Sequence, residues 1–314
     1  MKRKGVPARN SAGTSPCLRK MQTEFYRIAG LTFAVSADFE WLDRGLSQAF
    51  LLPGDAGETA EPIRLICRSV DRISAEVSMP QICRDETLTL RKSGETLLKE
   101  LRLYGSEEIY LSVRSREGSG EQQLFFSRAY REPAFRMRSL WDGVFLNHLL
   151  ATWGKTVLHA AYIEVGGRAI LFTAPSGTGK STQAELWERL CGAETVNSDR
   201  AVLGWAADGT LTASGIPQAG TGNVCRDRTL PVAAIVRVKQ SGVNRAVRLH
   251  GAEAVAALCE NAVYDRYRTN DEEVHLGTFI GLTDHVPVYR LECLPGEEAV
   301  GVMKAALRSD GVRI

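Results

Sequence analysis

The sequence predicts a protein of the α/β class, in which a β-rich N-terminal domain precedes a nucleotide-binding domain with a mixed sheet. A glycine-rich loop at residues 174–182 stands between a strand-like and a helix-like segment. Strand and helix periodicities alternate through the second half, whereas short strand-like segments succeed one another in the first. The length of 314 residues suits two domains of about 150 residues each.

We expect the β-rich domain over residues 23–135, after a basic tail at 1–22. Turn signals at Gly30, Gly94 and Gly118 separate its apolar runs, which predicts a meander of antiparallel strands. The expected strands are two around Gly30 within 25–35, then 63–67, 87–91, 97–103, 109–113 and 123–126. No chemical motif occurs here. The domain serves either to capture an extended peptide at a strand edge or as a structural or dimerising layer.

The nucleotide-binding domain is expected over residues 136–314. Apolar residues recur at helical spacing from 138 to 156, with Gly154 at the C-terminal cap position. Glycine turns at Gly166-Gly167 and Asp208-Gly209 predict hairpins, so antiparallel pairs enter the sheet. The other expected strands are 156–165, 168–173, 194–199, 201–205, 211–213, 231–238 and 286–291, and the other helices are 183–190, 252–262 and 296–307.

Residues 174–182 read Ala-Pro-Ser-Gly-Thr-Gly-Lys-Ser-Thr, a phosphate-binding loop with Ala in place of the first Gly. The glycines let successive N–H groups point at a polyphosphate, and the following helix adds its unpaired amides and dipole. Lys180 is expected to reach the β- and γ-phosphates and Ser181 to hold Mg²⁺. The residues expected to contact ATP are Pro175, Ser176, Gly177, Thr178, Gly179, Lys180, Ser181 and Thr182.

Phosphoryl transfer also needs an acid for Mg²⁺ and a group that orients the acceptor. Asp199 ends the next expected strand, 19 residues after Lys180, and is the candidate metal-linked acid. His159 lies on a strand that should neighbour the strand of the loop, and it serves either in the site or in the core. The candidate catalytic residues are therefore Asp199, His159 and Lys180.

A further segment, residues 215–228, is glycine-rich, polar and too long for a simple turn, which is typical of a lid or substrate wall. Arg226 or Arg228 within it is expected to meet phosphate charge.

The overall composition excludes several function classes. Lys and Arg total 39 against 37 acidic residues, and six of the basic residues fall in the first 20, a tail expected to be disordered. Nucleic-acid binding by this tail is the weaker alternative. No apolar run approaches the roughly 20 residues that cross a bilayer. Seven scattered cysteines without a Cys-x-x-Cys pair indicate reduced thiols and a cytoplasmic location.

The second half resembles the HPr kinase-like group within the phosphoenolpyruvate-carboxykinase-type nucleotide-binding fold, over roughly residues 138–308. Besides the phosphate loop, the resemblance is carried by Leu-His-Ala-Ala at 158–161, Val-Gly-Gly at 165–167, Asn-Ser-Asp-Arg at 197–200, Gly-Ile-Pro at 215–217, Leu-Pro at 230–231, Val-Lys-Gln at 238–240 and Val-Pro-Val-Tyr-Arg-Leu at 286–291.

This resemblance implies a kinase that uses ATP and Mg²⁺ to phosphorylate a hydroxyl, often that of serine. It implies Lys180 and Ser181 on phosphate and metal, with Asp199 and His159 in the site. Small members of the group accompany peptide natural-product pathways, including lasso peptides, and phosphorylate a precursor peptide. The implied partners are thus ATP and a peptide or protein that bears serine.

HPr kinases carry paired Asp where this chain has Ser198-Asp199, so the proton acceptor stays open between Asp199 and His159. Two alternative functions remain: a kinase for a free amino acid on the same fold, and a non-catalytic nucleotide-binding adaptor in a biosynthetic complex. The sequence leaves open whether the chain forms a homo-oligomer.

Overall fold

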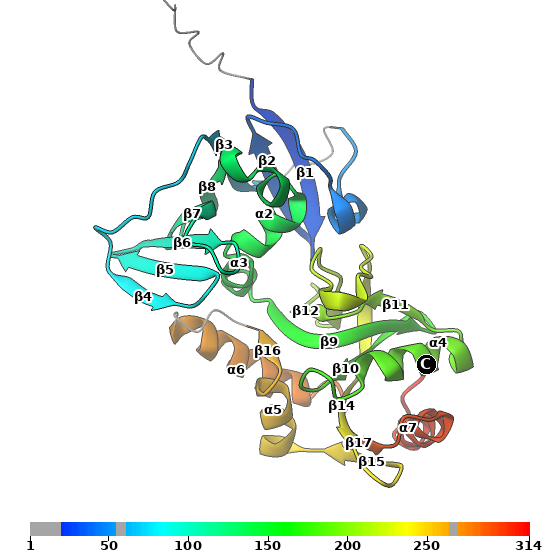
Figure 1. Ribbon diagram of the computed structural model, residues 1–314. Helices are drawn as coiled ribbons and strands as arrows, with labels where there is room; N and C mark the ends of the chain where they lie inside the picture. The colour runs from blue at the N-terminus through cyan, green and yellow to red at the C-terminus, as the bar shows by residue number, and fades with distance from the viewer. Residues whose placement is uncertain (1–19, 55–60, 264–268) are drawn as a thin grey trace, which may run out of the picture.

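The structure, a computed structural model, describes residues 20–54, 61–263 and 269–314 (Figure 1). Most of the predicted basic tail lies outside these ranges. In the described part no helix is both long enough and apolar enough to cross a membrane. The described cysteines are free thiols.

The first half forms an eight-stranded sheet with the order β1-β2-β3-β8-β7-β6-β5-β4. The strands are β1 Gln22–Ile28, β2 Leu31–Ala37, β3 Ile63–Val70, β4 Gln81–Arg84, β5 Leu88–Ser93, β6 Thr96–Arg102, β7 Ile109–Arg116 and β8 Glu121–Ser127. Gly30 and Gly94 occupy turns with positive φ, as predicted.

The expected antiparallel meander is correct for β4 to β8 but wrong for the whole sheet. Strand β3 pairs parallel to both β2 and β8. A long connection follows β2 and contains the 3₁₀ helix η1 Gly45–Phe50. A connection of this length can return the chain to the starting end of the sheet, which a parallel pair requires and a tight turn cannot provide.

The helical segment expected from 138 to 156 is instead a series of short helices. After the 3₁₀ turn η2 Arg128–Tyr130 come α1 Arg131–Ala134, α2 Met137–Gly143 and α3 Leu146–Thr152. The break at Val144 and Phe145 turns both side chains into the core, where they are buried. Gly154 has φ +65° and ends the series, in agreement with its predicted cap position.

The second half builds a nine-stranded mixed sheet around two long strands. Its strands are β9 Thr156–Val165, β10 Arg168–Thr173, β11 Glu194–Asn197, β12 Arg200–Trp205, β13 Leu211–Ser214, β14 Thr229–Gln240, β15 Arg245–Leu249, β16 Ala262–Val263 and β17 Val288–Cys293. Strand β9 pairs with β12 near its start and with β10 near its end. Strand β14 runs parallel to β10 and β17.

Helices cover both faces of this sheet. The helices are α4 Lys180–Cys191, α5 Gly251–Cys259, α6 Thr269–Thr283 and α7 Glu297–Ser309, and a 3₁₀ turn η3 spans Gly220–Gly222. Helices α4 and α7 pack on one face against alternate residues of β9, from Ala161 to Val165. Helices α5 and α6 pack on the other face, against Leu158, Ala160 and Tyr162. This alternation follows from the two-residue period of a strand.

The two halves share one hydrophobic core. Its centre is Trp141 on α2, which is fully buried, packs edge-on against Tyr26 and Phe33, and donates an indole hydrogen bond to Ser47 Oγ at 2.8 Å. The second half contributes to the same cluster through Val157, Val202, Ile216, Ala219 and Cys225. Helices α2 and α3, which follow the predicted boundary at residue 135, therefore pack with the N-terminal sheet.

Because the core is shared, we predict that both halves unfold in one transition and that Trp141→Ala lowers the free energy of unfolding by about 3–5 kcal/mol. Urea titration, followed by far-UV circular dichroism and by limited proteolysis, measures the number of unfolding transitions and the free energy of unfolding. Trp153→Ala is the matched control, since Trp153 is 59% exposed. Two separate transitions, or equal effects of the two substitutions, would contradict the shared core.

Candidate active site

The phosphate loop joins β10 to α4, as the sequence predicts. Gly177 and Gly179 adopt positive φ values of +76° and +109°, a backbone conformation that residues with a Cβ rarely adopt. Pro175, Ser176 and Gly177 are exposed, Thr178 and Gly179 half-buried. Ser181 is exposed and Thr182 half-buried in the first turn of α4. The loop thus presents its backbone and the start of a helix to solvent at one edge of the sheet.

Lys180 is folded back over its own loop. Its ammonium group is nearly buried, with 7% of the residue exposed, and donates to the carbonyls of Ala174 at 2.8 Å and Pro175 at 3.4 Å. Burial lowers the pKa of Lys180, while the charge of Asp199 raises it. An incoming phosphate would compensate this buried cation more fully than carbonyl dipoles do.

His159 and Asp199 meet beside the loop although 40 residues separate them. His159 Nε2 lies 3.1 Å from Asp199 Oδ1, and both side chains are about one quarter exposed. Strand pairing sets this contact: Arg200 faces His159 across β12 and β9, and the Ala160 amide donates to the Asp199 carbonyl at 2.9 Å. Thr173, at the end of the loop strand, donates its hydroxyl to the His159 carbonyl.

The Asp199 carboxylate is a persistent anion. The hydrogen bond from His159 is the largest cause that lowers its pKa below the ordinary value of 3.8, and the charges of His159, Arg200 and Lys180 add to it. Partial burial opposes the shift. The carboxylate therefore stays ionised at neutral pH and lies within electrostatic reach of the loop lysine.

The turn that carries Asp199 is held by Asn197, which is fully buried. Asn197 Oδ1 accepts from the amides of Asp199 and Arg200, both at 2.9 Å, and its Nδ2 donates to the Ile216 and Gln218 carbonyls. Such an Asx turn explains why the sequence has Asn before the acid. Ser198 points elsewhere: its hydroxyl donates to the Ala219 carbonyl at 2.7 Å.

Gln218 links this turn to the N-terminal half. Its Nε2 donates to the Trp141 carbonyl at 2.9 Å, and its Oε1 accepts from Arg200 at 2.6 Å. Arg200 in turn lies 3.4 Å from Asp199 Oδ2. The role of Gln218 depends on contacts between the halves, which leave no local sequence signature; its position after Gly215-Ile216-Pro217 in a long polar loop is the one signal in the sequence.

The structure does not bring Arg226 and Arg228 to the phosphate loop. Arg226 donates to the Thr195 carbonyl and faces Glu194, both at the start of β11, whereas Asp199 follows the end of that strand. Arg228 is exposed, and its charge acts on Tyr162 in the middle of β9. Phosphate binding by either arginine stays a prediction that the geometry does not support.

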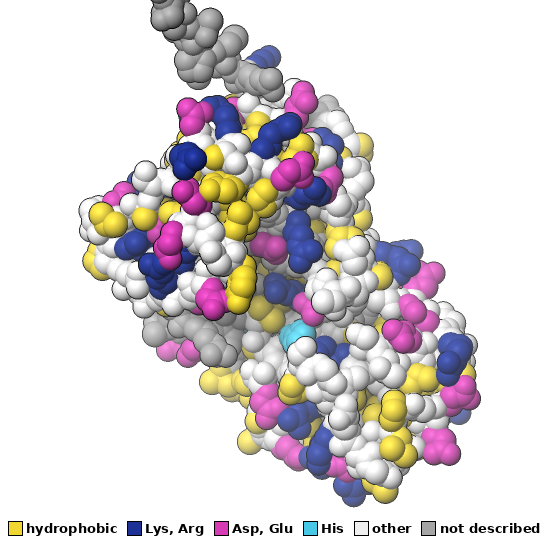
Figure 2. Space-filling view, viewed as in Figure 1, with side chains coloured by type: hydrophobic (Ala, Val, Ile, Leu, Met, Phe, Trp, Pro, Cys, Tyr) yellow, Lys and Arg dark blue, Asp and Glu magenta, His cyan; other side chains and the backbone are white. Residues whose placement is uncertain are grey.

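Two hollows are lined by residues of the candidate site. One, of about 270 Å³, lies between the halves and contains Asp199 and Arg200. The other, of about 420 Å³, lies beside the loop at the ends of β14 and β17, and is lined by Gly177, Thr178, Gly179, Thr182, Gln183, Val238, Gln240, Ser241, Cys293, Leu294 and Pro295. Figure 2 shows the hollowed zone between the two lobes, with basic and acidic side chains along it.

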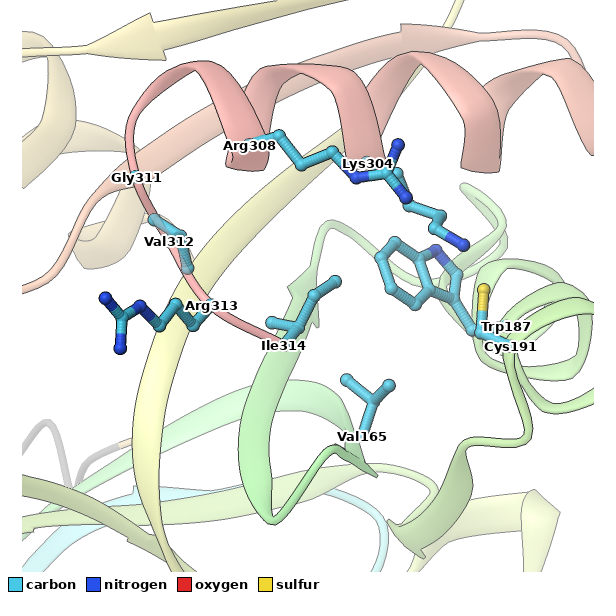
Figure 3. Close-up of a pocket in the computed structure, with 9 residues that line it drawn as sticks. All are labelled: Val165, Trp187, Cys191, Lys304, Arg308, Gly311, Val312, Arg313 and Ile314. Atoms are coloured by element: carbon cyan, nitrogen blue, oxygen red, sulfur yellow. The ribbon is translucent and has the colours of Figure 1, made fainter.

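A third hollow, of about 580 Å³, lies apart from the predicted site residues. Figure 3 shows it between α7, which carries Lys304 and Arg308, and the α4 side, which carries Trp187 and Cys191. Among the described residues, no three His, Cys, Asp or Glu side chains cluster as a metal site would require.

Glycines allow the 215–228 segment to lie against the Asp199 turn. A Cβ on Gly222 would meet Ser198 Cβ at 2.5 Å, and Gly222 does not need a positive φ. We predict that Gly222→Ala lowers the free energy of unfolding by about 1–3 kcal/mol through this overlap. Gly242→Ala is the control, since a Cβ there meets nothing within 4 Å. Equal urea midpoints for the two variants would refute the close packing.

Comparison with known proteins gives one family match. The family model described as "SynChlorMet cassette protein ScmC" matches residues 133–298. No curated protein matches. Among solved structures, the HPr(Ser) kinase/phosphatase from Coxiella burnetii is similar at 14% identity and a TM-score of 0.28, over 49% of this chain and 93% of that chain. Since the family model spans more than half of the 314 residues, the chain belongs to the ScmC family of SynChlorMet cassette proteins.

Proposed function

We propose that this protein is an ATP- and Mg²⁺-dependent kinase that transfers the γ-phosphoryl group to a serine hydroxyl of a peptide or protein. The contact of His159 with Asp199 beside the phosphate loop carries this proposal. A loop with Lys180 accounts for nucleotide binding, and an ionised carboxylate next to it accounts for transfer. The reduced thiols favour a cytoplasmic location.

The two hollows suggest how a bound nucleotide would be oriented. Asp199, whose charge acts on Lys180 of the loop, lines the hollow between the halves, where the γ-phosphate and the acceptor would meet. The second hollow lies at the carboxyl ends of the parallel strands β14 and β17, the edge where α/β sheets bind ligands. We place the nucleoside there. Gln183 lines this hollow, is 1% exposed, and its Oε1 has no partner among the described residues.

This free acceptor favours adenine over guanine. Gln183 Nε2 already faces Cys293 Sγ at 3.6 Å, so the amide oxygen is the group left for a ligand. The exocyclic amine of adenine is a donor, whereas guanine carries an acceptor oxygen at the corresponding position. An unpaired buried acceptor is costly, and a base amine would satisfy it.

Ser181 and Asp199 offer the hydroxyl and carboxylate oxygens that Mg²⁺ prefers, and they fit a site completed by phosphate oxygens and water. When bound, the metal would neutralise charge on the β- and γ-phosphates. Lys180 would exchange its loop carbonyls for phosphate oxygens. Arg200, held by Gln218, would add positive charge next to Asp199.

The transfer step forms a bond from the serine oxygen to the γ-phosphorus while the bond to the β,γ-bridging oxygen breaks. ADP leaves with the electron pair of that bond. The hydroxyl proton passes to the Asp199–His159 pair, since Asp199 lines the hollow between the halves and Ser198 bonds away from it. In a loose transition state the attacking hydroxyl needs little help from a base, so a carboxylate of low pKa is a sufficient proton acceptor.

A nucleotide-binding adaptor is the second candidate. Ser198 stands where paired acids are expected, and the family description names a cassette protein. Such an adaptor would bind ATP without transferring phosphate.

We predict that Lys180→Ala abolishes both ATP binding and phosphoryl transfer, whereas Asp199→Asn abolishes transfer and leaves ATP binding within about threefold. Labelled γ-phosphate from ATP·Mg²⁺ is followed onto free serine, an HPr-type protein and peptides bearing serine. Asp208→Asn serves as control, because Asp208 lies in an exposed hairpin turn. Tight ATP binding without transfer to any acceptor would favour the adaptor.

His159→Gln separates the roles within the pair. Glutamine can still donate to Asp199 but cannot take a proton at neutral pH. We predict that this variant retains most of the transfer rate if Asp199 accepts the proton. A loss as large as that of Asp199→Asn would assign the proton to His159.

We predict that Gln183→Leu raises the dissociation constant of ATP about tenfold. The substitution should also reduce the preference of the protein for ATP over GTP. The same substitution leaves the stability to urea unchanged or higher, because it removes an unpaired buried acceptor. Gln81→Leu, on the exposed edge strand β4, is the control. An unchanged ATP affinity would place the base elsewhere.

A further inference from the structure

The hollow of about 580 Å³ between α4 and α7 takes no part in the function proposed above. Four parts of the chain line it: α4 with Trp187 and Cys191, α7 with Lys304 and Arg308, the end of β9 with Val165, and residues 311–314 after α7. Its volume lies within the range of about 300–1,000 Å³ that small-molecule sites occupy. The hollow is therefore large enough for a small ligand.

The lining of this hollow carries an excess of positive charge. Lys304, Arg308 and Arg313 are cations, and no acidic side chain of the described residues lines the hollow with them. None of the three forms an ion pair or a side-chain hydrogen bond with another residue in the described part of the chain. The main-chain carboxylate of Ile314 is the one anion in this lining, and it lies against Gly166 at the β9–β10 hairpin. Three positive charges thus face one negative charge.

The helix itself does not account for both cations of α7. Lys304 and Arg308 are four residues apart, so they are neighbours on one face, where like charges destabilise a helix. The negative end of the helix dipole favours Arg308, which lies in the last turn. Lys304 precedes that turn, and the effect of the dipole falls off within it. An anion that both side chains contact would offset their repulsion.

Trp187 provides a second and independent observation. Its side chain is fully buried, and its indole N–H has no acceptor among the described residues. A buried donor without an acceptor is costly, and an oxygen atom of a ligand would remove this cost. Figure 3 shows the nitrogen edge of the indole turned to the side of the hollow where the ends of Lys304 and Arg308 lie. Two cations and one neutral donor therefore converge on one region of the hollow.

We infer that this hollow binds a small organic phosphate, a phosphate monoester with an apolar body. Such a group carries a charge of about −1.5 to −2 at neutral pH and three acceptor oxygens, which match two cations and an N–H donor. A carboxylate carries one charge and two oxygens, which match them less well. The apolar body would lie against Val165, Val312 and Ile314, and Figure 3 shows Val165 and Ile314 on the other side of the indole from α7. The inference does not depend on the proposed kinase activity.

Phenyl phosphate is the probe, and phenol, inorganic phosphate and benzoate are its matched comparisons. Binding to the full chain is measured by isothermal titration calorimetry, with a non-hydrolysable ATP analogue and Mg²⁺ at saturation so that the phosphate loop is filled. We expect phenyl phosphate to bind about tenfold tighter than each of the three, and less tightly at high salt.

Cysteine alkylation locates the bound probe. Cys191 lines the hollow and is half-buried, whereas Cys83 and Cys259 are exposed elsewhere. Phenyl phosphate should slow the reaction of Cys191 with iodoacetamide at least about threefold, as measured by peptide mass spectrometry. The rates at Cys83 and Cys259 should stay unchanged and serve as internal references.

Substitutions then assign the phosphate to its donors. Arg308→Gln and Lys304→Gln should each weaken phenyl phosphate binding about fivefold to tenfold, and Arg308→Lys should restore part of the affinity. Trp187→Phe keeps an aromatic ring but removes the donor, and should weaken binding about threefold. Arg189→Gln is the control, because Arg189 also lies between α4 and α7 but is 63% exposed, pairs with Glu297 and does not line the hollow.

Several results would overturn the inference. They are the absence of phenyl phosphate binding, equal affinity for phenol or inorganic phosphate, tighter binding of benzoate, and an equal loss in Arg189→Gln and Arg308→Gln. Binding that disappears in Lys180→Ala but persists in Arg308→Gln would assign the probe to the phosphate loop and also overturn the inference. Binding that persists in Lys180→Ala and weakens in Arg308→Gln supports it, whether or not the protein transfers phosphate.

Discussion

Strand β9 is the element on which the site depends. Its first residues pair with β12 and enter the core shared with the N-terminal half, while its last residues pair with β10, which leads into the phosphate loop. His159 lies where the strand changes partner. This position brings a residue of β9, the acid before β12 and the end of the loop strand to one place. A strand with only two neighbours along its whole length could not do so.

The electrostatics of the site form one balanced set. Lys180 is nearly buried, and burial lowers its pKa. Asp199 is partly buried, and its interactions with His159, Arg200 and Lys180 keep its carboxylate ionised. Removing one member of such a set leaves the others with an uncompensated charge, which costs more than the missing contact alone. The residue that holds the set in place is neutral: Asn197 fixes the backbone on both sides of Asp199.

Local signals were enough to predict much of this arrangement. The loop glycines, the hairpin at Gly166-Gly167 and the cap at Gly154 each need a positive φ that glycine supplies, and each has one in the structure. The parallel pairing of β3 and the break between α2 and α3 depend on long connections and on burial of Phe145, which have no local signature. Arg226 shows the same limit: its charge suits phosphate, but strand pairing places it beside β11.

The junction of the two halves brings η1 and α2, which pack with the N-terminal sheet, to the hollow beside Asp199. The family match begins at residue 133 and so includes α2 and Arg136 but not η1 or Arg44. The hollow next to Asp199 is therefore lined mostly by residues within the matched region, and residues 43–47 of its lining lie outside it. Gln218 bonds across this junction to the Trp141 carbonyl and, within its own half, accepts from Arg200, so a shift of α2 would reach the residues beside the Asp199 carboxylate. A molecule bound in this hollow would contact residues on both sides of the start of the family match and would lie beside the Asp199 carboxylate.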